Sequence, residues 1–133
     1  MQPDRWRLVF YVARSGRMPA KDFLDDLVER DPDRYAYFED VLLPLLNEHG
    51  PALGEPIFKR LGSTGLCEIR WSGSDRGHHR LYCTIERGRR ILLLHGCTKR
   101  WRRFDKLDRQ VCLDRYRDYQ SSDYDAAQRL TRS

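Results

Sequence analysis

Apolar and polar residues alternate at the start of the chain and then follow a helical spacing. The run from Trp6 to Ala13 has the two-residue period of a strand. Pro19 then fits the first turn of a helix. The apolar positions of this helix are Phe23, Leu24, Leu27 and Val28. The chain is therefore expected to begin with a strand followed by a helix.

A second amphipathic helix is predicted between Asp31, which is suited to cap it, and a stop signal at Gly50-Pro51. Its apolar stripe consists of Tyr35, Phe38, Leu42, Leu45 and Leu46. Pro44 lies inside this stretch, and an internal proline removes a backbone hydrogen bond at a cost of about 3 kcal/mol. We therefore expect either a kink near Leu42 to Pro44 or two shorter helices.

The part of the chain after Ile57 has the pattern of short strands separated by Gly and Ser. The three predicted strands are Gly65 to Trp71, His78 to Glu86 and Arg89 to Thr98. Their short connections favour an antiparallel three-strand meander. A last helix, capped by Asp105, is predicted from Lys106 to about Tyr119. Its inward-facing residues are expected to be Leu107, Val111 and Tyr116.

This order of elements predicts an α+β fold in one domain. A chain of 133 residues has room for a single core. We place this domain at residues 1–120 and expect the polar residues 121–133 to form a frayed tail. No apolar run approaches the roughly 20 residues that span a bilayer, and the N-terminus has no apolar signal-peptide stretch. We therefore predict a cytoplasmic protein that does not enter the membrane.

Positive charge is concentrated in the middle of the chain. The net charge is +5, but residues 57–117 carry 16 Lys and Arg against 6 Asp and Glu, whereas residues 1–56 carry 7 against 11. Arginine makes up 21 of the 25 basic residues, and its planar set of donors suits phosphate groups. Two interpretations stay open: a polyanionic partner such as a nucleic acid, or a basic face that is only solvated.

The four cysteines do not form a metal-binding motif. Cys67, Cys83, Cys97 and Cys112 lie 14 to 16 residues apart, with no paired C-x-x-C spacing and no nearby histidine in zinc-finger register. We interpret them as small buried apolar residues and assign them no role. Neither a metal nor another cofactor is expected.

The predicted strands carry a polar face that resembles an RNA groove. Alternation places Glu68 and Arg70 on one side of the first meander strand, and it places Arg80 and Tyr82 on one side of the next. His95 follows the apolar run of the third strand. The segment after it contains Lys99, Arg100, Trp101, Arg102 and Arg103. Basic side chains grip phosphates, and aromatic rings such as those of Trp101 and Tyr82 offer stacking surfaces for bases.

RNA cleavage without a metal needs a proton acceptor, a proton donor and cations around one phosphate. His95 is the best acid or base, because an unperturbed histidine has a pKa of about 6.5. Lys99 and the arginines would neutralise charge in the transition state. The alternatives are a histidine that only completes the end of a strand and cations that only hold the substrate.

Three segments of the chain, taken in order, are similar to a known family. They are LLPLLNEHGPALGEPIFKRLG, GLCEIR and HHRLYCTIERGRRILLLHGCTKR with the helix after it. The most diagnostic motifs are Lys59-Arg60-Leu61, Gly65-Leu66-x-Glu68-x-Arg70, Arg80-x-Tyr82 and Leu94-His95-Gly96 leading to Lys99. Over about residues 40–119 the chain resembles the phage-derived, HigB-like branch of the RelE/ParE toxin superfamily.

The resemblance implies a small toxin with a RelE-like fold that cuts mRNA in the ribosomal A site. It also implies a neighbouring gene for a helix-turn-helix, HigA-like antitoxin. By the same resemblance, Lys59, Arg70, Arg80 and Lys99 correspond to phosphate-handling positions, and His95 to an acid-base group. The ribosome enters through this analogy alone, because no residue by itself points to it.

The chain departs from the family pattern in several places. Cys97 stands where an aromatic residue usually follows the His-Gly pair, and the WRRF segment is bulkier and more basic than expected. Leu107 and Asp108 occupy the region where the RelE branch often has a tyrosine. If a tyrosine is required, Tyr82 or Tyr116 must supply it.

We predict the toxin of a type II toxin–antitoxin system, a ribosome-dependent and metal-independent mRNA endoribonuclease that inhibits translation. The predicted catalytic residues are His95, Lys99, Arg80 and Arg70. The predicted RNA-binding residues are Lys59, Arg60, Glu68, Tyr82, Arg100, Trp101, Arg102 and Arg103. Two alternatives remain: a ParE-like DNA gyrase poison, and a phage-derived RNA-binding module without catalytic activity.

Overall fold

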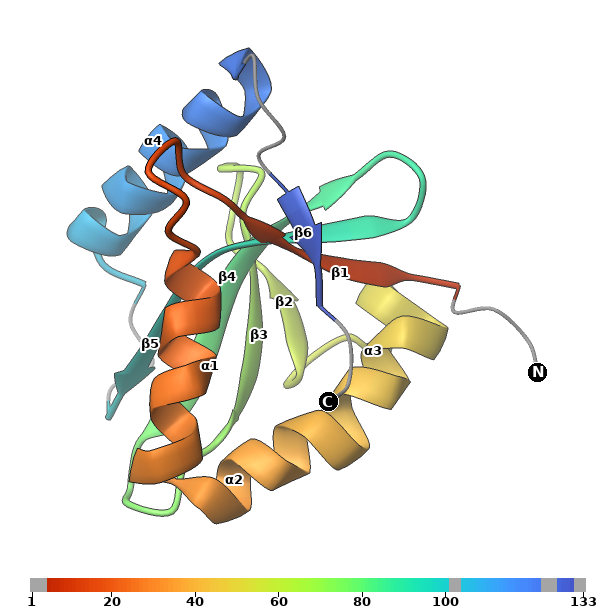
Figure 1. Ribbon diagram of the computed structural model, residues 1–133. Coiled ribbons are helices and arrows are strands. Elements are labelled where there is room, and N and C mark those ends of the chain that lie inside the picture. Colours follow the sequence, from red (N-terminus) through yellow and green to blue (C-terminus); the bar gives the residue numbers. More distant parts are fainter. Residues whose placement is uncertain (1–4, 101–103, 123–126, 131–133) are drawn as a thin grey trace.

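A six-stranded sheet with helices on both faces forms the core of the protein (Figure 1). The computed structural model describes residues 5–100, 104–122 and 127–130. The strands are β1 (Arg7–Tyr11), β2 (Phe58–Arg60), β3 (Cys67–Ser72), β4 (His78–Glu86), β5 (Arg90–Lys99) and β6 (Ala127–Arg129). The helices are α1 (Pro19–Arg30), α2 (Pro32–Tyr37), α3 (Leu43–His49) and α4 (Lys106–Ser121). The predicted α+β fold, with an N-terminal strand, an antiparallel meander and a C-terminal helix, is confirmed.

The sheet has the strand order β2-β3-β4-β5-β1-β6, in which β1 runs parallel to β5 and the other neighbours are antiparallel. The parallel pairing brings the first strand beside the last strand of the meander, far away in the sequence. The three-residue strands β2 and β6 are too short to produce a periodic signal, and they were not predicted. Because β6 pairs with β1, this part of the tail is an edge strand and not a frayed end.

Helices α1, α2 and α3 cover one face of the sheet with an apolar core. The residues that α1 buries, Ala20, Leu24 and Leu27, are spaced three or four positions apart and so share one stripe. Val28, the last apolar position of the predicted helix, lies at the edge of this stripe and is 46% exposed. Phe23 packs so closely on Gly96 that a Cβ at position 96 would overlap its ring.

The second predicted helix is divided at Pro44, as expected for an internal proline. A π-helical turn over Phe38–Leu42 separates α2 from α3 and places Pro44 in the first turn of α3. The π turn runs directly into α3, because the Leu43 N–H donates to the Phe38 carbonyl, and the proline follows at the start of α3. Asp31 precedes α2 but makes no side-chain cap, since its carboxylate turns instead to Ser74 and His79.

Helix α4 covers the opposite face of the sheet with a smaller core. Its predicted cap is confirmed, because the Asp105 carboxylate accepts a hydrogen bond from the Asp108 N–H at 2.8 Å. The predicted inward residue Leu107 is 72% exposed, and the buried residues of α4 are Asp108 and Cys112. The ion pair between Asp108 and Lys99 of β5 fixes this rotation of the helix. Within the described part of the chain, no helix is both long and apolar enough to cross a bilayer.

Candidate functional site

Strand register places most of the predicted site residues on the face of the sheet that α4 covers. Residues directly opposite one another on antiparallel strands point to the same side. One such row is Lys59, Glu68, Tyr82 and His95, the next is Arg70, Arg80 and Cys97, and the third is Ser72, His78 and Lys99. The prediction that these strands share a polar face therefore agrees with their register.

A register shift in β5 puts His95 on this face. Tyr82 is paired with His95 while the next residue, Cys83, is paired with Leu93, so Leu94 is an extra residue in β5. Simple alternation would have placed His95 on the side of Leu93, which belongs to the core under α1. With the shift, the rings of Tyr82 and His95 stack with their centroids 6.0 Å apart.

The polar face is not an open groove, because its centre is buried. The Arg80 Nη1 atom donates to Glu68 Oε1 at 2.6 Å, and the side chains of this ion pair are 1% and 4% exposed. Tyr82 is fully buried and its ring contacts that of Phe104. Burial, reinforced by Cys97, Asp108 and Glu68, raises the pKa of Tyr82. Glu68, Arg80 and Tyr82 therefore do not reach the surface in this arrangement.

An acid-base cluster lies at the edge of this buried centre and consists of His95, Lys99, Asp108 and Arg115. His95 Nε2 is 3.4 Å from Asp108 Oδ1, and Arg115 Nη1 is 3.1 Å from His95 Nδ1. Lys99 pairs with Asp108 and, at 2.7 Å, with Asp105. The structure thus brings the two best predicted catalytic residues together through a carboxylate of α4.

The environment of the cluster sets the charges of its members. Burial and the Arg115 guanidinium lower the pKa of His95, although Asp108 opposes them. Burial also disfavours the Lys99 ammonium, but its bonds to Asp105 and Asp108 outweigh this effect and raise the pKa of Lys99. The cluster therefore presents a neutral imidazole beside a charged ammonium at neutral pH. Because a guanidinium only donates, Nδ1 of His95 is assigned as the acceptor and Nε2 as the protonated nitrogen.

Two pockets flank α4 and differ in their chemistry. The first, of about 490 Å³, lies between β2 and the start of α4 and is lined by four cations, Lys59, Arg60, Lys106 and Arg109, together with the Phe104 ring. The second, of about 440 Å³, contains His95, Arg115 and Arg17. The four cations thus line the first pocket, and the acid-base cluster opens into the second.

The remaining predicted residues are dispersed. Arg70 lines a third pocket with Arg34 and Tyr37, away from His95. Arg100 is exposed beyond the end of β5, while residues 101–103, which include Trp101, Arg102 and Arg103, lie outside the described part of the chain. The four predicted catalytic residues thus divide into a pair at the cluster, one buried cation and one at the far pocket.

Sequence reasoning missed the contribution of α4 to the site. Asp108 and Arg115 are seven residues apart with Cys112 between them, which is the spacing of one helix face. A search for polar residues at this spacing would have found that face, whereas the apolar pattern drew attention to Leu107. Lys106 and Arg109 of the first pocket were not predicted, for the same reason.

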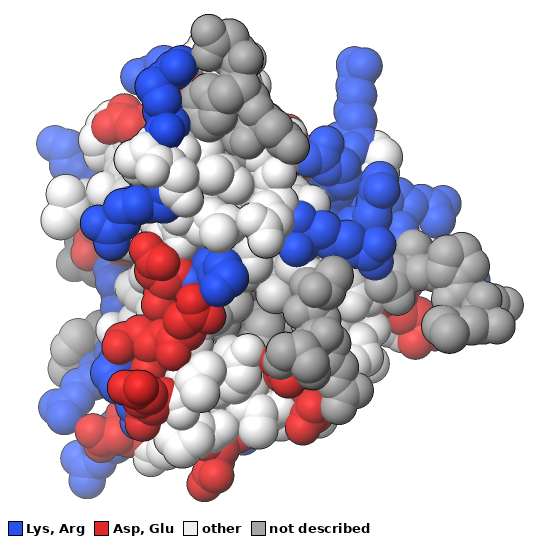
Figure 2. All heavy atoms as spheres, in the orientation of Figure 1, with Lys and Arg blue, Asp and Glu red and all other residues white. Residues whose placement is uncertain are grey.

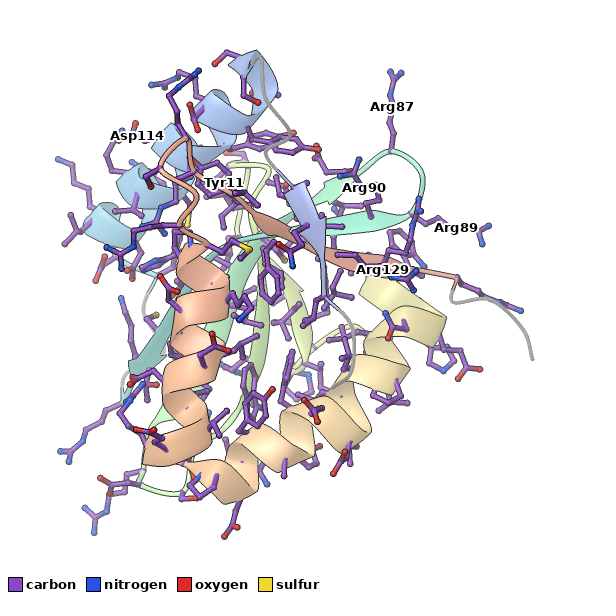
Figure 3. All side chains as sticks on the ribbon, in the orientation of Figure 1. Tyr11, Arg87, Arg89, Arg90, Asp114 and Arg129 are labelled. Carbon is purple, nitrogen blue, oxygen red and sulfur yellow. The ribbon has the colours of Figure 1, made fainter. Side chains whose placement is uncertain are left out.

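A second concentration of positive charge lies at the β4–β5 hairpin. The arginine cluster consists of Arg7, Arg87, Arg89 and Arg90, and Figure 3 shows three of them beside Arg129 of β6. Arg7 and Arg90 are direct partners in the sheet. Figure 2 shows basic side chains gathered here and acidic ones along α1. Among the described residues, none of these four arginines takes part in an ion pair.

Comparison with known proteins places the chain in a family. A search of curated proteins found no match. A family model described as Phage derived protein Gp49-like (DUF891) matches residues 25–117, which include every member of the acid-base cluster. This family is known in the context of RelE-type toxin–antitoxin systems. The chain belongs to the Gp49-like family of phage-derived proteins.

Proposed function

We propose that this protein is the toxin of a type II toxin–antitoxin system, in the HigB-like branch of the RelE/ParE superfamily, and that it cleaves mRNA on the ribosome. The observation that carries the proposal is the acid-base cluster. It holds a histidine of lowered pKa between a carboxylate and a guanidinium, with an ammonium group on the same carboxylate. A neutral base beside cations is what phosphodiester cleavage through a 2′-hydroxyl requires.

In the proposed reaction, His95 Nδ1 accepts the proton of the attacking 2′-hydroxyl. The 2′-oxygen then bonds to phosphorus, the bond from phosphorus to the 5′-oxygen breaks, and the leaving oxygen takes a proton from solvent. Arg115 must first turn from Nδ1 to the phosphate, and its bond to the Leu94 carbonyl at 2.8 Å keeps it beside the site. Lys99 supplies a second positive charge to the phosphate, and the attraction between the two is strongest where water is excluded.

The buried ion pair has a supporting role in this proposal. Arg80 is the cross-strand partner of Cys97, two residues from His95, so its ion pair with Glu68 supports the strands that carry the cluster. Arg70 remains a proposed phosphate contact at the far pocket. The first pocket, with its cations and the Phe104 ring, would receive nucleotides next to the scissile phosphate, because phosphates and base faces need those two kinds of group.

The proposed partners follow from charge and family. The exposed arginine cluster is suited to the phosphate backbone of ribosomal RNA, which positions a protein without reading sequence. A helix-turn-helix, HigA-like antitoxin is the proposed inhibitor. The second candidate function is an RNA-binding module without catalytic activity. It is favoured by the ion pairs of Lys99 with Asp105 and Asp108, because they neutralise the ammonium that the reaction would need.

Cell-free translation tests the proposal directly. Wild-type protein should cause rapid loss of message with cuts inside codons, and purified mRNA without ribosomes should stay intact. His95→Gln should remove the cutting, whereas the exposed His49→Gln, in α3, should not change it. Salt-sensitive RNA binding without any cutting would support the binding module instead. Linearised plasmid in the presence of gyrase would support a ParE-like poison and overturn the proposal.

A further inference from the structure

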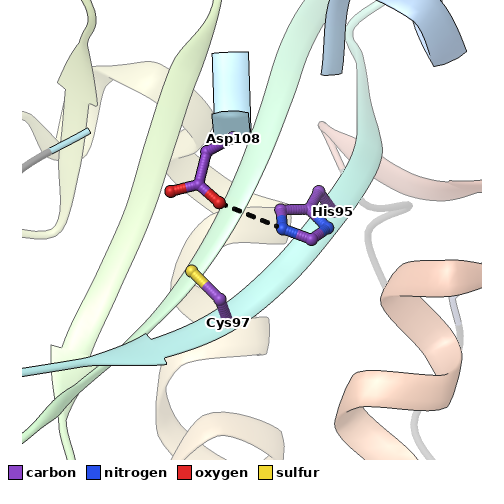
Figure 4. A group of neighbouring side chains, drawn as sticks. All are labelled: His95, Cys97 and Asp108. Carbon is purple, nitrogen blue, oxygen red and sulfur yellow. Dashed lines mark ion pairs between the residues drawn. The ribbon is translucent and has the colours of Figure 1, made fainter. Parts of the chain in front are cut away.

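Cys97 lies beside His95 and Asp108 of the acid-base cluster, so three side chains with different donor atoms meet there. His95 and Cys97 alternate along β5 and so share its polar face, and Asp108 faces them from α4 (Figure 4). One nitrogen, one sulfur and one oxygen of these residues all lie within 4.8 Å of one another. We propose that His95, Cys97 and Asp108 form a binding site for a divalent transition metal of the Zn²⁺ class.

The geometry of the three donors is close to that of a zinc site. Zinc binds nitrogen and oxygen at about 2.0–2.2 Å and sulfur at about 2.3 Å, so donors in a tetrahedron lie roughly 3.5 Å apart. Small side-chain rotations therefore suffice to bring the present donors, at most 4.8 Å apart, around one ion. The mixed nitrogen, sulfur and oxygen set selects Zn²⁺ and its neighbours over Mg²⁺ or Ca²⁺, which prefer oxygen alone.

The charges around the site allow the metal to replace existing contacts. When Asp108 turns to the ion, the Lys99 ammonium keeps Asp105 as its partner at 2.7 Å. The ion takes the place of the protons on the Cys97 thiol and on His95 Nε2, and Nδ1 takes up a proton. Arg115 then gives up its contact with Nδ1 and retains the Leu94 carbonyl at 2.8 Å. The carboxylate and the new thiolate together balance the two charges of the ion.

Position distinguishes Cys97 from the other thiols of the chain. Cys67, Cys83 and Cys112 are buried, whereas Cys97 is partly exposed. Within the part of the chain that the structure describes, this is the one place where three histidine, cysteine or acidic side chains gather closely enough to hold an ion. Three protein ligands leave a fourth position open for water, which also leaves a route by which the ion enters and leaves.

Metal binding would regulate the reaction proposed above, and this step rests on the proposed function. An ion on His95 Nε2 forces a proton onto Nδ1, the atom that accepts the proton of the 2′-hydroxyl. The bound form is therefore the inactive form, and a chelator restores the base.

Cobalt titration of the folded protein tests the site without any RNA. Co²⁺ bound to a thiolate absorbs in the near ultraviolet, and Zn²⁺ displaces it. We expect one equivalent of Co²⁺ to give this band. Cys97→Ser should abolish the band and weaken Zn²⁺ binding by about 100-fold, since even outer groups of a metal site contribute 10- to 100-fold. Cys67 is a buried thiol of the core under α1 to α3, and the matched control Cys67→Ala should retain both the cobalt band and the Zn²⁺ affinity. A wild-type protein without the band, or a band that persists in Cys97→Ser, overturns the proposal.

Thiol alkylation provides a second measurement that needs no substitution. Zn²⁺ should slow alkylation of Cys97 in the wild-type protein by at least about tenfold, and a chelator should reverse the effect. An unchanged alkylation rate at saturating Zn²⁺ overturns the site. In the cleavage assay, Zn²⁺ should inhibit wild type reversibly and Cys97→Ser only at about 100-fold higher concentration. If no form of the protein cleaves RNA, the proposed function fails, while the cobalt and alkylation results still decide the metal site.

Discussion

Two histidine–aspartate pairs lie on opposite faces of the same sheet and differ in their surroundings. His79 Nε2 is 2.7 Å from Asp31, both side chains are almost fully buried, and His79 Nδ1 is bonded to Thr98. His95 Nε2 is 3.4 Å from Asp108, its side chain is 23% exposed, and two cations contact the pair. The first pair has every polar atom satisfied inside the protein. The second pair contacts two cations and lies beside a pocket, so a ligand that enters the pocket can replace these contacts.

The faces that carry these pairs are held together differently. Helices α1 to α3 are attached by a continuous apolar core. Helix α4 packs on a smaller apolar cluster through Cys112, Leu113, Tyr116 and Tyr119. Polar contacts add to this attachment: Lys99 to Asp108, Arg115 to the Leu94 carbonyl, Tyr116 to Glu86 and Tyr11 to Asp118. Apolar burial dominates stability, whereas polar contacts are replaceable by those of a substrate. The face under α1 to α3 therefore carries the larger apolar core, and the face under α4 has the polar contacts that the proposed function would exchange for contacts with RNA.

The two pairs are distinguished most clearly by replacing one histidine at a time. His95→Gln should lower cleavage by about 1,000-fold, since it removes the proposed base, and should change the free energy of unfolding by less than about 0.5 kcal/mol. His79→Gln should lower that free energy by about 2 kcal/mol, because it leaves Asp31 and Thr98 without a buried partner. Urea unfolding and cleavage rates measured on the same preparations check both. Similar effects of the two variants on cleavage would contradict the separation of roles.

The next largest effect is expected at the carboxylate of the buried pair. Asp31 accepts hydrogen bonds from the Ser74 N–H and hydroxyl and from His79, which ties the α1–α2 junction to the β3–β4 loop. Asp31→Ala should destabilise the protein by about 3 kcal/mol, because the buried His79 and the two Ser74 donors lose their acceptor together. The matched control is Asp75→Ala, in the same loop but exposed, with less than about 0.5 kcal/mol expected. Equal losses for both variants in chemical denaturation would contradict this assignment.

The same carboxylate gives a pH dependence with a definite sign. Burial alone would raise the pKa of Asp31, but the hydrogen bonds from Ser74 and His79 outweigh it and lower the pKa from 3.8 to about 2. The folded state therefore favours the ionised form, so this contribution is fully present above about pH 4 and is lost as the pH falls toward 2. Asp31→Asn should flatten the stability profile in this window only. An unchanged acid limb in Asp31→Asn would show that other carboxyls control it.

The sequence predicted the long periodic elements of the fold and missed those that depend on distant partners. Helix α1, the meander β3 to β5 and the division at Pro44 follow from local spacing and from the chemistry of proline. Strands β2 and β6 have three residues each, and only their neighbours in the sheet make them strands. The parallel pairing of β1 with β5 is likewise a property of the whole chain.

The candidate site was predicted in part, for a comparable reason. Strand alternation placed Glu68, Arg70, Arg80 and Tyr82 on shared faces. The needs of RNA cleavage singled out His95 and Lys99, and the resemblance agreed with both. The register shift at Leu94, which turns His95 toward α4, has no signal in the composition of β5. Burial of the Arg80–Glu68 pair and the role of Asp108 depend on how α4 lies across the sheet, which the apolar pattern of that helix predicted incorrectly.

The smallest effect is expected at Leu107, which tests whether α4 is attached to the sheet through this apolar residue or through polar contacts. Leu107→Gln should change the free energy of unfolding by less than about 0.5 kcal/mol, because the side chain is 72% exposed and α4 is oriented by Asp108 instead. Leu27→Ala in α1, whose side chain is fully buried, should cost about 3 kcal/mol. Thermal unfolding of the two variants measures the difference. A large loss from Leu107→Gln would mean that α4 packs through this leucine, and the polar attachment of α4 and the exchange of partners proposed for this face would then lose their basis.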